Sequence, residues 1–510
     1  MSESNKKNKN AENKTGKRSN LLYTLIAVAF VAVAAVSLIW RYTSNAPAKD
    51  LHAVTIDGQE YTAAEVNFYY QNLCSNFINN NYYFLTYLGL DLNTSLKEQV
   101  ISEDAASLMG MEAGITWHEY LLGETLNQMA GMQDLLADAE ATGYTYPDTL
   151  ETLFESNMDA LTSAAASSNM TTEQYLTAVF GSNMTLEVYE KQMMNALKYE
   201  VYASSVYDAF TYTAADLKAA YEADRNTYDS AAYEYVLISG AAETTTDADG
   251  NTVDATEEES AAAKNAAKQA ADEMLSALNA GGDLKTLAAA NEKATYMNET
   301  AGTYYGTVLT EWAFDMGRTV GDTAVLESGS NYYVVLFHER YLDTTNTVDV
   351  RHILLQPEAG ELTSDADGYE AEQEKLLADC KAAAEALLAE WKAGEATEES
   401  FAALANEHSS DGGSNTTGGL YVGVQPGTMV QEFNDWCFDA SRKPGDTGIV
   451  YGTNGAYEGY HIMYYSGDNV PAWELTVEEA LRNEDTNNWI STFGVNAAIE
   501  RIDAGLELVG

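Results

Sequence analysis

The sequence is poor in cysteine. Its 510 residues include only three cysteines, which lie far apart and show neither a CxxC motif nor a Cys/His metal spacing: Cys74, Cys380 and Cys437. This pattern excludes a disulfide-stapled scaffold and a structural zinc site. With so few thiols, the chain is suited to an oxidising compartment.

Positive charge is also scarce. The chain has 27 Lys and Arg against 78 Asp and Glu, which gives a formal net charge of −51. Residues 1–50 hold eight of the basic and three of the acidic residues, so the body of the chain is more acidic still. Because such a body repels phosphate backbones, a role in nucleic-acid binding is excluded. The same charge favours a surface that stays soluble outside the cell.

Apolar residues, by contrast, are plentiful. They make up 46% of the chain and aromatic residues make up 11%, which excludes wholesale disorder. A chain of this length is too long for one hydrophobic core, so we expect two to four domains.

Residues 21–40 form an uncharged apolar run that follows a basic tail over residues 1–20. Twenty helical residues span about 30 Å, the thickness of the hydrocarbon core of a bilayer. We therefore predict a transmembrane anchor over 21–41, with the tail in the cytoplasm and the rest of the chain outside. This predicts a single-pass protein of the cell membrane. The alternative is a cleaved signal peptide, for which residues 46–48 (Ala-Pro-Ala) offer small side chains.

The first extracytoplasmic segment, residues 51–225, is predicted to be a helical domain. Residues 51–62 show the alternation of a short hairpin around Asp57-Gly58. From there to about residue 225, Leu, Met, Tyr and Ala recur at helical spacing. A Met- and Tyr-rich helical surface is suited to holding unfolded chains, although the same residues can simply pack the helices together.

An internal duplication occupies the rest of the chain. Residues 312–323 (WAFDMGRTVGDT) and 436–447 (WCFDASRKPGDT) match at seven of twelve positions at an offset of 124. Each is preceded by an apolar strand, an acidic loop and an Ala-rich helix, and each is followed by another apolar strand. This predicts two domains of one α+β fold, at 226–345 and 346–470.

Both copies contain the tetrapeptide DADG in their acidic loops. In the first copy, Asp247, Asp249, Asn251 and Glu258 have spacings similar to those of a calcium loop. The glycine of such a loop belongs at its sixth position, whereas Gly250 falls at the fourth. A solvated acidic loop is therefore favoured over a calcium site.

Only the second copy combines a histidine pair with a glycine-rich loop. His352 and His461 lie in strands, at positions where the first copy has Tyr235 and Tyr333, which predicts that the two positions face one another across adjacent strands. The alternative is a buried, mutually hydrogen-bonded pair with no other role.

The loop and an apolar pair accompany those histidines. Residues 409–420 (SSDGGSNTTGGL) contain Asp411, and Met429 and Phe433 are spaced to share one helical face. The first copy lacks this loop and has Tyr305 and Leu309 at the positions of the apolar pair. Features that are present or absent together favour a single site.

The second copy resembles a parvulin-type peptidyl-prolyl cis-trans isomerase domain over residues 347–468. The matching motifs are RHILL, FAALANEHSSD, GG, MVQEF, PGDTG and GYHI. The layout of the whole chain is similar to that of PrsA/SurA-type extracytoplasmic foldases, in which a helical chaperone domain accompanies one or two parvulin domains. This resemblance implies an α+β protein with a transmembrane helix, an all-helical chaperone domain and two tandem parvulin-like domains, the first of them degenerate. It also implies that the last segment, residues 474–510, returns to complete the chaperone domain.

The resemblance also assigns residues. His352 and His461 correspond to the paired active-site histidines of the family, and Asp411 to a position that parvulins fill with Cys or Asp. The pocket for the proline ring corresponds to Met429, Phe433 and Phe438. Two departures stand out: a hydrophobic span replaces the lipid-anchored cysteine of related proteins, and extra sequence near Asn454 obscures the threonine that parvulins place near the second histidine.

The resemblance implies an enzyme that isomerises X–Pro bonds in exported polypeptides without a cofactor or metal. Rotation about the amide breaks no covalent bond, so the site must only favour the twisted amide over the planar one. The alternative function is a non-catalytic holdase that binds unfolded exported chains, and a weaker one is an acidic scaffold. The expected partners are unfolded chains and the membrane, with no nucleic acid, and a homodimer is one option for assembly.

Overall fold

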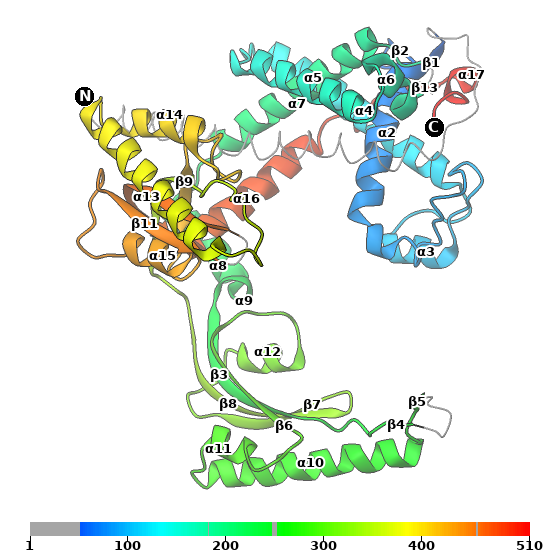
Figure 1. Cartoon of the computed structure of the whole chain (residues 1–510). Coiled ribbons are helices and arrows are strands. Elements are labelled where there is room, and N and C mark those ends of the chain that lie inside the picture. The colour runs from blue at the N-terminus through cyan, green and yellow to red at the C-terminus, as the bar shows by residue number, and fades with distance from the viewer. Residues whose placement is uncertain (1–50, 182, 247–251, 455–456) are drawn as a thin grey trace. The chain divides into compact units, whose positions relative to one another are not determined.

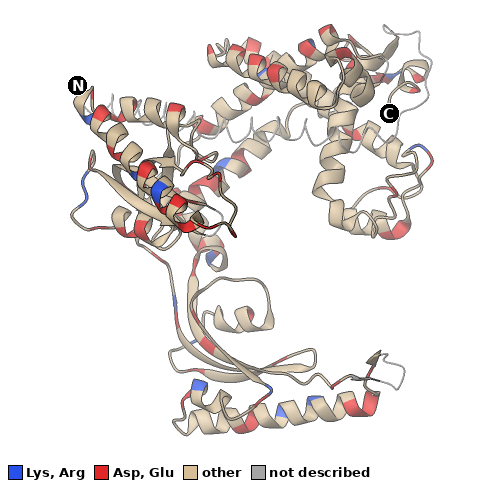
Figure 2. Ribbon diagram, in the orientation of Figure 1, with Lys and Arg blue, Asp and Glu red and all other residues tan. Residues whose placement is uncertain are grey.

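The computed structural model describes residues 51–181, 183–246, 252–454 and 457–510. The predicted cytoplasmic tail (1–20) and transmembrane anchor (21–41) lie outside these residues, as does most of the first DADG loop. Across the described ranges, no helix combines the length and the apolar character needed to cross a bilayer. The chain divides into two compact units, one ending at Thr211 and resuming at Ala480, the other spanning Tyr212–Glu479. Acidic side chains outnumber basic ones in both (Figure 2).

The first unit is mainly helical (Figure 1). Side-chain caps start several of its helices: Thr62 and Glu65 form a capping box at α2, and Thr171 and Gln174 form one at α6. Its helices are α2 (Ala63–Asn80), η1 (Tyr82–Phe84), α3 (Glu103–Met109), α4 (Trp117–Ala141), α5 (Thr149–Ser167), α6 (Thr172–Phe180), α7 (Leu186–Ala209), the end of α16 (Ala472–Ile490) and α17 (Asp503–Leu506).

A small sheet joins these helices. The predicted hairpin is present as β1 (His52–Ile56) and β2 (Gln59–Thr62), with a turn at Asp57 and Gly58. A third strand, β13 (Ile499–Arg501), pairs with the other edge of β1, so the order is β13-β1-β2. The expectation of an all-helical domain is therefore wrong in this detail. The reason is a pairing between segments more than 440 residues apart, which no local pattern contains.

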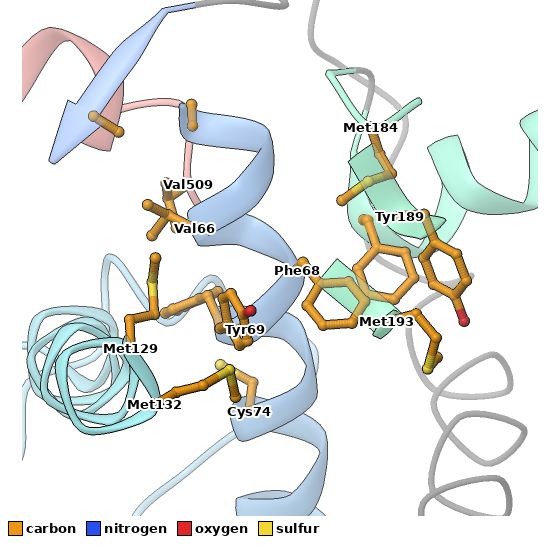
Figure 3. Packing of buried hydrophobic residues seen from close by; sticks show 14 of the residues in the cluster. Val66, Phe68, Tyr69, Cys74, Met129, Met132, Met184, Tyr189, Met193 and Val509 are labelled. Atoms are coloured by element: carbon orange, nitrogen blue, oxygen red, sulfur yellow. The ribbon is translucent and has the colours of Figure 1, made fainter. Parts of the chain in front are cut away.

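The core of the first unit is rich in methionine and aromatic rings. Phe68 of α2 stacks on Phe180 at 5.7 Å and meets Tyr189 of α7 edge-on. Figure 3 shows Phe68 and Tyr189 together with sulfur-bearing residues of α2, α4 and α7 and with Val509 from the C-terminal segment. The returning segment also contributes Trp489 and Phe493, which pack with residues of α4 and α7. Most of the predicted Met and Tyr residues here thus pack helices against one another.

The second unit contains the duplication. After α8 (Ala214–Ala223) and α9 (Arg225–Tyr228), the first repeat consists of β3 (Ser230–Ile238), β4 (Thr245–Thr246), β5 (Thr252–Val253), α10 (Glu257–Asn279), α11 (Leu284–Ala288), β6 (Ala294–Gly302), α12 (Val308–Ala313), β7 (Thr323–Ser328) and β8 (Asn331–Tyr341). The second repeat consists of β9 (Asn346–Leu355), α13 (Tyr369–Ala393), α14 (Glu398–His408), β10 (Leu420–Val424), α15 (Gln431–Cys437), β11 (Thr447–Thr453) and β12 (Glu458–Pro471).

The two repeats share one topology. Their antiparallel sheets have the orders β6-β3-β8-β7 and β10-β9-β12-β11, in which corresponding strands occupy the same places. In the first repeat, α10 and α11 pack on one face of the sheet and α12 on the other (Figure 1). In the second, α13 and α14 cover one face and α15 the other. The duplication predicted from the 124-residue offset is confirmed at the level of strand order.

Candidate active site

The two histidines of the second repeat lie on adjacent strands. On the paired strands β9 and β12, His352 lies opposite Met463 and His461 lies opposite Leu354. The two histidines are therefore diagonal neighbours, offset by two residues along the strands. Residues two apart on a strand share a face, and here that face is the one covered by α15. The Nδ1 atoms are 2.9 Å apart and the rings are stacked with centroids 5.1 Å apart. The predicted facing of the two positions is confirmed, in this diagonal form.

The glycine-rich loop brings Asp411 to the outer nitrogen of the pair. It follows α14 and is bound to β9 by backbone hydrogen bonds, from His352 N to Gly419 O (2.8 Å) and from Ser410 N to Leu354 O (2.8 Å). In this position Asp411 Oδ2 lies 2.8 Å from His352 Nε2. Both imidazoles are buried, while the carboxylate keeps 19% of its surface exposed.

Three donors converge on the same carboxylate oxygen. Besides His352, the hydroxyl of Tyr421 donates to Asp411 Oδ2 at 3.0 Å, and the hydroxyl of Ser414 donates to it as well. These bonds favour the ionised form of the carboxyl. The hydrogen bond from His352 and those from Ser414 and Tyr421 hold the pKa of Asp411 well below its usual range, against the opposing effect of burial.

The far end of the pair is bound by a tyrosine. The hydroxyl of Tyr457 lies 3.2 Å from His461 Nε2. Since ionised Asp411 only accepts, His352 donates to it from Nε2, and a neutral His352 would accept at Nδ1. In that arrangement His461 donates from Nδ1 and accepts the Tyr457 proton at Nε2. One direction of donation then runs from Tyr457 through the two imidazoles to Asp411. We call these four residues the polar relay.

The relay sets an expectation for pH dependence. Burial, reinforced by the neighbouring His352, lowers the pKa of His461 to about 4. Between pH 6.5 and 4 the unfolded chain therefore binds more protons at this site than the folded chain does, so stability rises with pH across that window. Protonated His461 also has no acceptor left for Tyr457.

We expect kcat/KM for X–Pro isomerisation to fall with a midpoint near pH 4 as His461 becomes protonated. NMR exchange spectroscopy, which needs no coupling protease, measures this profile. Activity that persists unchanged below pH 4 would contradict this pKa of His461.

An apolar group lies against the relay. The ring of Phe433, in α15, meets the imidazoles of His352 and His461 edge-on, with centroids 5.5 and 5.4 Å away. Met429 and Phe438 are half-buried and pack against the same cluster. We call these three residues the apolar shelf. All six predicted site residues therefore lie on one face of the sheet or in the loop that borders it.

One detail of the shelf differs from the prediction. Met429 and Phe433 were expected to share a helical face, but α15 begins only at Gln431. Val430 is the N-cap and has an extended backbone (φ −55°, ψ 148°), which places Met429 before the helix. Met429 and Phe433 nevertheless belong to the same apolar cluster, because the extended residue between them keeps the segment beside it.

The buried thiol near the shelf is not a nucleophile. Cys437 is buried among apolar residues of the α15 face, and burial raises its pKa to about 12. A thiol that stays protonated at neutral pH cannot attack an amide.

Sequence reasoning missed Tyr421, Ser414 and Tyr457. Ser414 lies three residues after Asp411 in the same loop, and Tyr421 lies just beyond it in β10, so a search for hydroxyls near the aspartate could have found them. Tyr457 lies in the extra sequence between Thr453 and His461 that obscured the family pattern. Thr453 itself donates to the carbonyl oxygen of Tyr457 at 3.1 Å. The tyrosine thus occupies the place beside the second histidine.

We expect Tyr457→Phe to lower kcat three- to tenfold with little change in KM, because one hydrogen bond is worth about 1 kcal/mol. Loss of this donor leaves the His461 tautomer less fixed, so the ¹⁵N shift of its Nε2 should move as well. Tyr451→Phe is the matched control, since its hydroxyl binds Glu458 in the same sheet, away from the relay. Equal effects of the two variants would argue against a positioning role for Tyr457.

Among its described residues, the first repeat has no equivalent relay. Tyr235 and Tyr333 take the places of the histidines, with ring centroids 5.7 Å apart. A short link, residues 289–293, joins α11 to β6 where the second repeat has its long loop, and no carboxylate of the described residues forms a hydrogen bond with Tyr235 or Tyr333.

Comparison with known proteins agrees with this geometry. Residues 332–463 match the family model of the PPIC-type PPIASE domain, a range that includes the whole relay and shelf. No curated protein matches the chain. The match confirms the resemblance to parvulins for the second repeat, and the chain thus carries a peptidyl-prolyl cis-trans isomerase domain.

Solved structures with similarity include a peptidylprolyl isomerase, PrsA, from Bacillus anthracis, at 20% identity and a TM-score of 0.15. That match covers 29% of this chain and 58% of PrsA, so the chain spans less than two thirds of that relative. Two structures reported for the SurA-like chaperones PEB4 and Cj1289 of Campylobacter jejuni match at 11% and 14% identity. They cover 57% and 71% of this chain and 82% and 89% of their own, with TM-scores of 0.15 and 0.14.

Proposed function

We propose that the chain is a membrane-anchored extracytoplasmic foldase whose second repeat isomerises X–Pro bonds in exported polypeptides. The observation that carries this proposal is the contact between the polar relay and the apolar shelf. A proline ring needs an apolar surface, whereas its amide needs a polar environment that changes as the bond twists. The Phe433 ring, in contact with both imidazoles, brings the two together.

The reaction requires no other chemical group from the protein. The barrier to rotation is roughly 18–20 kcal/mol because resonance gives the C–N bond partial double-bond character. Any group that stabilises the twisted amide more than the planar one lowers this barrier. On the half-buried side chains of Met429 and Phe438 the proline would leave water, and without water its carbonyl would lose the hydrogen bonds that favour the planar, polarised form.

Asp411 has two candidate roles in this scheme. It can exert a negative field near the substrate carbonyl, which disfavours the polarised resonance form, or it can order the histidines. Three hydrogen bonds already saturate Oδ2, the oxygen that faces His352. This geometry favours the ordering role, with the histidines then held in one tautomer beside the ring of Phe433.

In this proposal the first repeat does not catalyse. It retains an aromatic cluster around Tyr233 and Phe314 but lacks the relay, which suits a spacer or a client-binding module. The predicted anchor over 21–41 would hold both repeats and the helical unit outside the membrane, where exported chains emerge unfolded. The predicted domain limits, with 51–225 and 474–510 as a chaperone domain, remain part of the proposal.

A protease-coupled assay on the full chain tests the catalytic proposal. We expect the wild type to accelerate cis-to-trans conversion of an Ala-Pro tetrapeptide, and Phe433→Ala to lower kcat/KM at least 100-fold because the proline loses its apolar contact. Leu309→Ala, at the equivalent position of the first repeat, is the matched control and should leave the rate unchanged. A wild-type rate at background would leave only the holdase function.

A further inference from the structure

An exposed aromatic segment lies in the first unit, outside the proposed catalytic site. Four aromatic residues occur within six positions after α2, and they are among the most exposed large apolar side chains of the described residues: Tyr82 (63%), Tyr83 (89%), Phe84 (57%) and Tyr87 (77%). We call them the aromatic tip. At 150–250 Å² per ring, the tip exposes roughly 500 Å² of aromatic surface, near the upper end for the largest patch of a soluble monomer.

The exposure does not come from a loose segment. The chain turns through η1 and is closed by backbone hydrogen bonds from Leu88 N to Phe84 O (3.0 Å) and from Leu90 N to Leu85 O (2.9 Å). Leu85 and Leu88 point inward and are at most 6% exposed. The same turn therefore buries its leucines and directs its aromatic rings to solvent.

The tip belongs to a lobe with its own small core. Leu88, Leu90, Ile101 and Trp117 are buried together there, at the end of α2 that lies away from the β13-β1-β2 sheet (Figure 1). Because this core is already closed by leucines, the aromatic rings are not needed to complete it. Exposing them costs free energy that a binding partner would recover.

The charge of the lobe indicates the partner. Residues 81–116 carry five exposed acidic side chains and one lysine, and among the described residues none of the five forms an ion pair: Asp91, Glu98, Glu103, Asp104 and Glu112. Aromatic faces attract guanidinium and ammonium groups, and carboxylates around them add to that attraction. The same charges would repel anionic membranes and nucleic acids.

We propose that the aromatic tip binds extended, basic and apolar polypeptide segments of unfolded chains. Arg or Lys stems would lie along the rings, with their charged heads directed to the surrounding carboxylates. The inference rests on the proposed foldase function and adds a holding site in the first unit that needs no proline. The proposed ligand of the tip is a peptide. Binding of a glycan or of a lipid surface in its place would overturn the proposal.

Fluorescence anisotropy with the full chain in a nonionic detergent tests this site. The probe is a labelled, proline-free 12-residue peptide of Arg, Leu, Gly and Ser, compared with its Glu-for-Arg analogue. We expect the basic peptide to bind at least tenfold more tightly, with affinity falling severalfold between 50 and 300 mM salt because salt screens the charged part of the attraction.

Variants then locate the site. Tyr83→Ser with Tyr87→Ser should weaken binding of the basic peptide about tenfold, while Tyr305→Ser, which alters an equally exposed tyrosine of the first repeat, should not. Unchanged binding by the tip variant, equal binding of the acidic peptide, or capture of oligosaccharides or phosphatidylglycerol vesicles in place of the peptide would overturn the proposal. Isomerase rates on the tetrapeptide report separately on the catalytic proposal, and the tip variant should leave them unchanged.

Discussion

Replacing Asp411 by alanine is expected to lower kcat/KM for X–Pro isomerisation about 10²-fold, or ~2.7 kcal/mol of transition-state stabilisation. The substitution leaves three donors, on His352, Ser414 and Tyr421, without their common acceptor. His352 can then adopt either tautomer, and the direction of donation from Tyr457 is lost. The measurement is the initial rate on an Ala-Pro tetrapeptide with the full chain.

Two further variants serve as a control for Asp411→Ala and distinguish the two candidate roles of Asp411. Asp435→Ala removes an exposed carboxylate of α15 that accepts hydrogen bonds from Gln431 and Asn434 of the same helix, and it should leave the rate unchanged. Asp411→Asn keeps an acceptor but removes the charge, so under the ordering role it should recover activity to within tenfold of wild type. An asparagine variant as slow as the alanine variant would instead assign Asp411 the field effect.

Replacing Gly419 by alanine is expected to cost ~4 kcal/mol of stability in the second repeat and to abolish isomerisation. Its φ of +66° already disfavours a side chain by ~1–2 kcal/mol. A Cβ there would also lie 2.0 Å from the carbonyl oxygen of His352, which is backbone and cannot swing away. The loop would have to leave β9, breaking the bond from His352 N to Gly419 O and carrying Asp411 with it.

Gly427→Ala separates the two causes. This glycine has a φ of +82°, but a Cβ there meets no atom within 4 Å, so only the backbone cost of ~1–2 kcal/mol applies. Thermal unfolding followed by near-ultraviolet circular dichroism should show a much larger shift for Gly419→Ala. Similar shifts for both variants would mean that the glycine-rich loop is not held against the histidine strand.

Much of the site could be predicted because the second repeat could be compared with the first repeat of the same chain. The tyrosines at 235 and 333 marked the strands and the face on which the histidines lie, and absence of the loop from the first repeat marked Asp411. The register follows from the same alternation, since one-residue slips would turn either histidine to the opposite face. The differences between the two repeats therefore indicated which residues form the site, and a single domain would not have shown this.

The missed features depend on geometry that strand and helix patterns do not encode. Tyr457 binds His461 through the conformation of a turn, and Ser414 and Tyr421 reach Asp411 only because the loop folds back on β9. The start of α15 at Gln431 depends on one extended residue, Val430. The strand β13 pairs with β1 across almost the whole described chain, and such long-range pairing leaves no local periodicity to detect.

The proposed catalysis requires a proline that binds the apolar shelf beside the polar relay. NMR exchange spectroscopy on an Ala-Leu-Pro-Phe peptide with catalytic amounts of the full chain tests this directly, since uncatalysed isomerisation takes tens to hundreds of seconds. We expect cis–trans exchange peaks at sub-second mixing times with wild type, and none with Phe433→Ala. Absence of exchange with wild type, or undiminished exchange with Phe433→Ala, would contradict it.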